Sequence, residues 1–175
     1  MPEETGDKSL LEFLDTPQLN CLNEEGEHTL KALLSSKSKN TSSSTYLLSD
    51  ADEQLLLNIP FNQTVRVRSI VIQSSNLEQA PKTIKLFINK ESLGFEDVED
   101  ATEPEAAQIF ELTEEQVEEG KPISLRFVRF QTVNSLHIFV ATNGGDDVTR
   151  IDALDILGVP VAGTRDLSGL KKTEE

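Results

Sequence analysis

The segment from Leu125 to Asn143 constrains the fold of this chain most strongly, because it holds two apolar runs separated by a short polar stretch. It reads LRFVRFQTVNSLHIFVATN, and phenylalanine, valine and isoleucine dominate both runs. Such side chains pack well on a pleated sheet and are poor helix formers. The segment therefore predicts a buried β-hairpin with its turn at Gln131 to Ser135. Apolar residues occupy both parities of the first run, so we expect both faces of that strand to be covered.

Further segments of strand length and apolar character follow the same pattern and are separated by turn-rich residues. They are residues 54–59, 65–72, 83–88, 107–112 and 151–157. Helical spacing of apolar residues is confined to Leu10–Leu14 and Thr29–Leu34, and the serine-rich residues 35–45 predict a surface loop. With the two hairpin arms this makes seven strands and little helix, which predicts an all-β sandwich or barrel with short peripheral helices.

The length and the cysteine content point to one domain inside the cell. A chain of 175 residues suits a single core. Its one cysteine, Cys21, excludes an intramolecular disulfide, and its first residues lack the basic and apolar regions of a secretory signal. No apolar run approaches the length of about 20 residues that spans a bilayer. We therefore expect a cytoplasmic protein, with the nucleus as a second compartment, and no membrane partner.

The charge of the chain is strongly acidic, with 31 Asp and Glu against 16 Lys and Arg and a formal net charge of -15. Nucleic acid and anionic lipid would be repelled, so neither is an expected partner. No Lys or Arg occurs between Lys90 and Lys121. We call residues 91–119 the acidic segment. It has two interpretations: a solvated loop with a short helix, or a docking surface for a basic partner.

Catalytic and zinc sites have little support in the sequence. The only histidines are His28 and His137, and His137 lies in a predicted strand, as expected of a structural histidine. No nucleophile, base and orienting group are evident together. Structural zinc usually needs four Cys or His ligands, and the chain offers three. Cys21 lies beside Leu19 and Leu22, which predicts a buried, apolar role.

Two oxygen-rich loops raise the question of calcium. One contains Asp50, Asp52 and Glu53, and the other contains the set Asn143, Asp146 and Asp147 around a Gly-Gly pair. Their oxygens could converge on a cation. Aspartate and asparagine beside glycine are also ordinary turn residues that accept local backbone hydrogen bonds. We predict no metal and no other cofactor.

Several segments, in the same order, resemble the PITH domain, the C-terminal proteasome-interacting domain of thioredoxin-like proteins. The matching segments are CLNE at 21–24, SDADEQLL at 49–56, FNQ at 61–63, KLFIN at 85–89, FELT at 110–113, residues 125–143, TRI at 149–151 and GVPV at 158–161. The resemblance implies a jelly-roll β-sandwich of the galactose-binding-domain-like type over residues 9–172. Residues 1–8 would then be a flexible N-terminus, and residues 173–175 a C-terminal tail.

The resemblance also implies a function, namely docking on the regulatory particle of the 26S proteasome. The best known members carry a thioredoxin domain with a Cys-x-x-Cys pair, whereas this chain has only Cys21. It is therefore expected to be a stand-alone, monomeric PITH protein without oxidoreductase chemistry. The alternative is a small-ligand or glycan-binding module. Sugar sites favour aromatic side chains that stack on the sugar, and this chain has no tryptophan and a single tyrosine, Tyr46, which opposes that alternative. An enzyme has the least support.

Candidate contact residues follow from fold analogy, because sandwiches of this type bind ligands with loops at one end. We expect five residues to meet there as a partner-binding site: Asp50, Asp52, Glu53, Asn89 and Arg150. Arg66 and Arg68 lie two apart on a predicted strand and are expected to face solvent, with Val65 and Val67 facing the other way.

Overall fold

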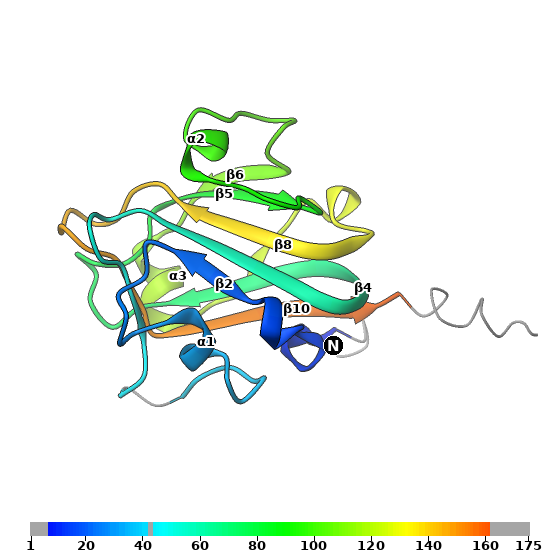
Figure 1. Ribbon diagram of the computed structural model, residues 1–175, viewed down its shortest axis with the longest axis horizontal. Coiled ribbons are helices and arrows are strands. Elements are labelled where there is room, and N and C mark those ends of the chain that lie inside the picture. Colours follow the sequence, from blue (N-terminus) through cyan, green and yellow to red (C-terminus); the bar gives the residue numbers. More distant parts are fainter. Residues whose placement is uncertain (1–6, 42–43, 162–175) are drawn as a thin grey trace, which may run out of the picture.

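The computed structural model describes residues 7–41 and 44–161. Its strands form a two-layered antiparallel β-sandwich in which one long strand belongs to both layers (Figure 1). This strand is β4 (Leu55–Gln73), which pairs through residues 55–60 with β8 (Val133–Val140) and through residues 65–73 with β10 (Ala153–Pro160). The register against β8 shifts between Pro60 and Val65. The two halves of β4 thereby join the layers covalently.

The other strands extend these two layers. The first layer adds β2 (Asn20–Leu22), β5 (Thr83–Ile88) and β6 (Gln108–Glu111), and the second adds β1 (Lys8–Ser9) and β7 (Ile123–Ser124). A separate pair consists of β3 (Leu47–Leu48) and β9 (Arg150–Ile151). Short helices lie at the periphery: η2 (Leu10–Phe13), η3 (Thr16–Gln18), α1 (Leu30–Leu33), α2 (Phe95–Val98), α3 (Glu114–Glu119) and η4 (Phe127–Arg129). The predicted all-β sandwich with short peripheral helices is confirmed. Across the described ranges, every helix is too short or too polar to cross a membrane.

The main core fills the space between the two layers. Leu57 and Val67, one from each half of β4, are both fully buried in it together with Ile138 of β8. A second cluster lies on the outer face of the first layer, where Phe87 and Phe139 pack under the chain around α2. The first layer is therefore covered on both faces, which explains why β8 is apolar at both parities.

Lys85 anchors the acidic segment to the sheet. Its Nζ donates hydrogen bonds to the carbonyl oxygens of Val98 at 3.2 Å, Glu99 at 2.7 Å and Ala101 at 2.9 Å. These carbonyls lie at the C-terminal end of α2, where the backbone has no helical donors and the helix dipole favours a cation. The acidic segment is thus ordered, and it contains α2, β6 and α3, which is more regular structure than the loop with a short helix that was one of its two interpretations.

The predicted hairpin is wrong in its first arm. Strand β7 ends at Ser124, and the chain then forms the η4 turn. The turn is bracketed by two backbone hydrogen bonds to β4, from Leu125 N to Arg68 O at 3.0 Å and from Val67 N to Phe130 O at 3.0 Å. Between these two points the chain leaves the sheet edge, so Phe127 and Val128 are 54% and 67% exposed. Only the second arm, β8, is the strand that its composition predicted.

Other expectations hold with altered boundaries. The predicted strands 54–59 and 65–72 are the two halves of β4, and both short helical segments are confirmed. Thr29 begins α1 as its N-cap by accepting a hydrogen bond from Ala32 N at 3.1 Å. Residues 1–6, 42–43 and 162–175 lie outside the described residues. The undescribed residues include most of the expected flexible N-terminus, part of the serine-rich loop, the end of the domain and the tail 173–175.

The Lys85 anchor generates a stability prediction. We expect Lys85→Met to lower the free energy of unfolding by about 2 kcal/mol, because three carbonyl oxygens lose a charged donor. Urea unfolding at pH 7 measures this loss, and amide hydrogen exchange of residues 95–107 should rise at the same time. Lys82→Met, at an exposed position just before β5, is the matched control and should change the free energy by less than about 0.5 kcal/mol. Equal effects of the two substitutions would contradict the anchoring role.

Candidate functional site

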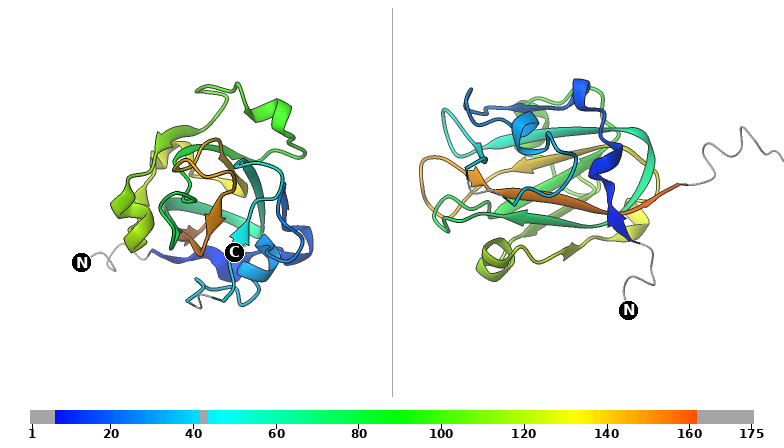
Figure 2. Two further views of the ribbon diagram at one scale, coloured as in Figure 1. Left: turned by 90° about the vertical axis from the view of Figure 1, so that its left-hand side faces the viewer. Right: turned by 90° about the horizontal axis from the view of Figure 1, so that it is seen from below.

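Three loops meet at the end of the sandwich where β8 ends and β4 begins. They contain residues 49–54, 74–82 and 141–149, and they face the viewer in the left-hand view of Figure 2. Ser49 and Thr149 join two of them: Ser49 N donates to Thr149 O at 2.9 Å, and Thr149 N donates to Ser49 Oγ at 2.8 Å. The Thr149 hydroxyl in turn donates to Glu53 O at 2.6 Å. Because both residues are buried, this polar clamp fixes the loops relative to each other.

Asn23 orders the loop that contains Asp50 and Asp52. Its Nδ2 donates to Asp52 Oδ1 at 2.9 Å and to Gln54 O at 2.7 Å, and its Oδ1 accepts from Ala51 N at 3.1 Å. Asn23 has a φ of 71°, a left-handed conformation that asparagine tolerates better than most residues. The sequence analysis missed this role. An asparagine followed by the turn-forming Glu24-Glu25-Gly26 was the available signal.

The acidic oxygens of the loops are engaged in local turns. Asp52 Oδ1 also accepts from Gln54 N at 3.0 Å, Asn143 Oδ1 accepts from Gly145 N at 2.9 Å, and Asp146 Oδ1 accepts from Asp147 N. These contacts match the interpretation of the residues as turn formers. Within residues 7–41 and 44–161, no three His, Cys, Asp or Glu side chains group closely enough to hold a metal. An open hollow of about 480 Å³ separates the two acidic loops.

Arg150 lies beside these loops but is fully engaged. Its guanidinium donates to Asp152 through Nη2 at 2.8 Å and through Nε at 3.0 Å, and the Asp152 hydrogen bond raises its pKa. The guanidinium carbon lies 3.7 Å from the ring centre of Tyr46. His28 stacks on the same ring at 4.1 Å between ring centres. Two groups this close to one ring centre must occupy opposite faces, so both faces of Tyr46 are covered.

Asn89 does not join the other candidate residues, and its predicted position is wrong. It follows β5 opposite Ser135, five residues before the end of β8, which places it about 17 Å from the loop end at roughly 3.3 Å per residue. There its Oδ1 accepts from Asn134 N at 2.7 Å, and its Nδ2 donates to Thr132 O at 2.9 Å. Asn89 therefore closes the turn before β8. Asp50, Asp52, Glu53 and Arg150 do come together at the opposite end.

The structure also brings together a serine, a histidine and an asparagine on the outer face of the first layer. Ser135 Oγ lies 2.9 Å from His137 Nε2, and His137 Nδ1 lies 2.7 Å from Asn58 Oδ1. The sequence analysis found no such grouping, because Asn58 is distant in sequence and meets His137 only through the pairing of β4 with β8. The geometry resembles the relay of a serine hydrolase.

Two features make this grouping structural. The backbone N–H of Lys90 also donates to His137 Nε2, at 3.2 Å, so the lone pair that would accept a proton from Ser135 is shared. Burial lowers the pKa of His137 to about 4, from an ordinary value of 6.5, which makes it a poor general base at neutral pH. The imidazole is 4% exposed and joins β8 to the turn after β5. We therefore assign it a structural role, as predicted for His137.

Cys21 has the predicted buried character. Its side chain is 7% exposed, and burial raises the pKa of its thiol, with a further contribution from Glu24. A thiol held in its protonated form is a weak nucleophile. Cys21 therefore contributes to the core.

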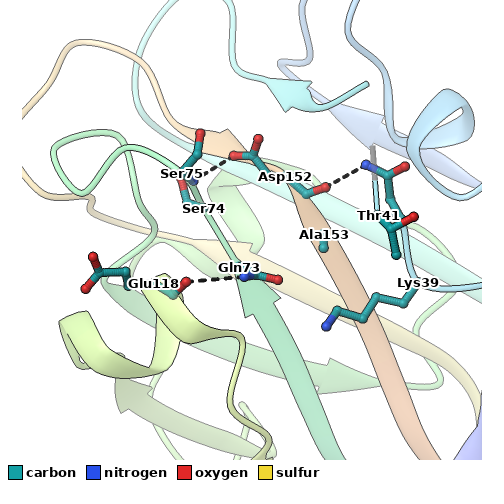
Figure 3. Close-up of a pocket in the computed structure, with 9 residues that line it drawn as sticks. Lys39, Thr41, Gln73, Ser74, Ser75, Glu118, Asp152 and Ala153 are labelled. Atoms are coloured by element: carbon teal, nitrogen blue, oxygen red, sulfur yellow. Dashed lines mark hydrogen bonds between the residues drawn. The ribbon is translucent and has the colours of Figure 1, made fainter. Parts of the chain in front are cut away.

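A second polar hollow, of about 410 Å³, lies where β4 ends and β10 begins, between the serine-rich loop and α3 (Figure 3). Asp152 organises it: its carboxylate accepts from Ser75 N at 2.9 Å, and its backbone oxygen accepts from Asn40 Nδ2 at 2.9 Å. Gln73 Nε2 donates to Glu118 O at 3.2 Å on the other side. These hydrogen bonds join the serine-rich loop, the residues after β4 and α3, so we assign the hollow a structural role.

The η4 turn is a surface that the sequence analysis missed. In residues 7–41 and 44–161, Phe127 and Val128 are the exposed large apolar side chains. The turn is rigidly held, because Arg126 N donates to Gln108 Oε1 at 2.8 Å and the Arg126 guanidinium pairs with Glu103, whose pKa this contact lowers. The alternation of arginine with apolar residues in LRFVRF was the available signal, since a fully buried strand would not carry two charges.

Protonation of His137 predicts a specific pH dependence of stability. The pKa of His137 is about 4 in the folded chain and about 6.5 when unfolded. Between these values the unfolded chain binds a proton that the folded chain does not, so stability is full above pH 6.5 and falls as the pH decreases. We expect His137 to contribute about 2 kcal/mol to the loss between pH 7 and pH 5.

Urea unfolding at the two pH values measures this contribution. His137→Gln should remove it, whatever the substitution does to stability at pH 7, whereas His28→Gln should retain it. An unchanged difference between pH 7 and pH 5 in His137→Gln would show that other groups cause the acid sensitivity.

Comparison with solved structures identifies the fold. The chain is similar to a family 32 CBM of NanJ from C. perfringens, solved in complex with galactose, with a TM-score of 0.61 and 11% identity over 86% of this chain and 98% of that chain. It is also similar to the C-terminal domain of a Bacteroides fragilis chitobiase, with a TM-score of 0.59 and 16% identity over 89% and 99% of the two chains. The sandwich is thus galactose-binding-like, as the sequence predicted.

Comparison with other sequences identifies the family. Thioredoxin-like protein 1 of Schizosaccharomyces pombe is 42% identical over 173 residues, which cover 97% of this chain and 57% of that protein. PITH domain-containing protein CG6153 of Drosophila melanogaster is 33% identical over 86% of this chain and 69% of its own length, and human PITH domain-containing protein 1 is 31% identical over 83% and 66%. The chain thus spans little more than half of the fission yeast protein. Residues 1–175 match the PITH domain, and the chain belongs to the PITH domain family.

Proposed function

We propose that this chain is a non-catalytic protein-interaction module that docks on the regulatory particle of the 26S proteasome. The observation that carries the proposal is the η4 turn with its two exposed apolar side chains, Phe127 and Val128. Exposed apolar groups on a strongly charged protein are characteristic of a protein contact, and a buried aromatic often supplies much of the binding energy. Backbone hydrogen bonds to β4 at both ends of the turn and the contacts of Arg126 hold it in place, so little ordering would accompany binding.

Membership of the PITH domain family supports the choice of partner. The resemblance found in the sequence implies the 26S proteasome, and the acidic segment provides a second surface that suits basic patches of a large assembly. A role on this particle would require the chain in the cytoplasm or the nucleus. We propose that it acts there as a monomer.

A glycan-binding role has less support. The neighbour from C. perfringens was solved with galactose, and sugar sites commonly use an exposed aromatic face. Here the single tyrosine, Tyr46, is covered on one face by His28 and on the other by Arg150. No tryptophan exists to replace it. The loop end therefore offers polar and acidic groups without a stacking platform.

An enzymatic role also has less support. PITH and CBM-like domains are non-catalytic types of module, and the serine-histidine-asparagine grouping described above lacks a basic histidine at neutral pH. The raised pKa of Cys21 likewise opposes thiol chemistry.

Co-migration with purified 26S proteasome on a native gel tests the proposal, at low and at physiological salt and with the isolated core particle as control. We expect the chain to bind the 26S form alone. The double variant Phe127→Ser, Val128→Ser should weaken binding at least tenfold, since truncating an interface anchor costs roughly 2 kcal/mol. Its melting temperature should stay near that of the wild type because both side chains are exposed. A folded wild-type chain that fails to bind would refute the proposal.

The acidic segment generates a separate kinetic prediction. Replacing Glu114, Glu115, Glu118 and Glu119 with Gln should slow association with the 26S particle and flatten its salt dependence, while leaving the domain folded. Lys121 pairs with two of these four side chains, Glu115 and Glu119, so the main effect should come from the other two. Association rates by surface binding at several salt concentrations measure this.

The matched control neutralises four acidic side chains outside α3, at Glu12, Glu27, Glu78 and Glu91. It changes the net charge equally, so an equal slowing in both variants would mean that total charge, and not the helix α3, steers association.

A further inference from the structure

A groove of about 560 Å³ runs between the η4 turn and the second half of β4. Arg66 and Arg68 line it from the strand, and Phe127 and Gln131 line it from the turn and the segment that follows. Val65 and Val67 alternate with the arginines and are fully buried in the core. The period of two in the strand therefore places both arginines on the outer face, as the sequence predicted.

The two arginines are only partly neutralised. The Nε atoms of Arg66 and Arg68 are buried and make no hydrogen bond to any part of the chain that the structure describes. Arg68 Nη1 lies 3.8 Å from Asp7 Oδ1, within reach of an ion pair but too far for a hydrogen bond. Burying an arginine donor without an acceptor is unfavourable, so an acceptor bound in the groove would stabilise both side chains.

The other arginines of this region are already engaged. Arg126 pairs with Glu103, and Arg129 Nη2 donates to Pro104 O at 3.0 Å. These contacts position the turn. Among the residues that the structure describes, the groove lining contains two cations, Arg66 and Arg68, and one acidic side chain, Asp7, which leaves one surplus positive charge. The chain as a whole has a net charge of -15, so the groove differs in sign from most of the surface.

The spacing of the arginines specifies the ligand further. Residues two apart on a strand lie roughly 6.6 Å apart, at about 3.3 Å per residue, and an extended peptide presents its alternate side chains at the same spacing. Two carboxylates at alternate positions of such a peptide would meet both guanidinium groups. An apolar side chain two residues further along would share their face and reach Phe127 of the η4 turn.

We infer that this groove binds an extended acidic segment of a partner protein, with carboxylates on Arg66 and Arg68 and an apolar side chain on the η4 turn. The inference rests on the proposed function, whose partner chemistry it specifies. A short peptide meets only the local positive field of the groove. A long polyanion such as nucleic acid would extend over the acidic remainder of the surface and be repelled.

Fluorescence anisotropy with the full chain tests the inference directly. The probe is a short fluorescein-labelled peptide with the sequence Glu-Ser-Glu-Ser-Phe, whose glutamates and phenylalanine share one face of an extended chain, and the control peptide carries lysine in place of glutamate. We expect the glutamate peptide to bind and the lysine peptide not to bind. The double variant Arg66→Gln, Arg68→Gln should raise the Kd for the glutamate peptide at least tenfold, and Phe127→Ser several-fold. Lys31→Gln with Lys82→Gln, at two exposed lysines remote from the groove, removes the same charge and should leave the Kd unchanged.

Equal Kd values for the wild type and the double arginine variant would overturn the inference, and so would a folded wild type that binds neither peptide. If the peptide does not bind, and sedimentation velocity shows a dimer that the arginine variant abolishes, the groove would instead be assigned to a second copy of the chain.

The native-gel assay separates this inference from the proposed function. If the arginine variant co-migrates with the 26S particle as well as the wild type does, docking stands and the groove assignment fails. If the peptide binds but the 26S particle does not, the groove stands and the proteasome assignment fails.

Discussion

The continuity of β4 is the constraint on which the rest of the structure depends. Its first half pairs with β8 and its second half with β10, and the same strand also pairs with β2 and β7. Because inward side chains from both halves fill one core, neither layer can separate without breaking the strand that they share. Between Pro60 and Val65 the strand crosses from one layer to the other, so both of its ends lie at one end of the sandwich and the crossing lies at the opposite end. One end carries the clamped acidic loops, and the strand beyond the crossing carries the arginines of the groove.

Charge is distributed unevenly over this framework, and side-chain contacts hold the distribution in place. Lys85 ties the acidic segment to the sheet through three carbonyl oxygens. Arg126 ties the same segment to the η4 turn through Glu103. The acidic segment and the groove lined by Arg66, Arg68 and Phe127 therefore lie close together and are held in fixed positions by the same contacts. A partner of mixed charge would meet both at once, which favours one orientation of docking over others.

The sequence predicted correctly those strands whose apolar side chains do lie in the sheet. Residues 83–88 match β5 in both boundaries, because a run rich in β-branched and apolar residues lies between the turn residues Pro81 and Asn89. The run at 125–130 failed because β-propensity records which side chains suit a sheet and carries no information about whether a neighbouring strand edge is available. The chain there makes a one-turn excursion from β4, which only the tertiary structure reveals. The sequence analysis missed the grouping of Ser135, His137 and Asn58 for a similar reason, because one sequence does not show the register between strands that are far apart along the chain.

Asn89 was placed at the wrong end of the sandwich because the sequence shows where a strand ends but does not show at which end of the sandwich that point lies.

Tyr46, enclosed between His28 and Arg150, has a consequence for how the protein can be observed. The chain contains one tyrosine and no tryptophan, so fluorescence excited at wavelengths beyond phenylalanine absorption comes from a single ring at the loop end. That emission is a built-in local probe. It will follow the opening of the stacked rings, yet it will be largely blind to events at the distant turn before β8. Melting curves followed by tyrosine fluorescence will therefore report on the loop end alone, and far-ultraviolet circular dichroism will be required to follow the whole sandwich.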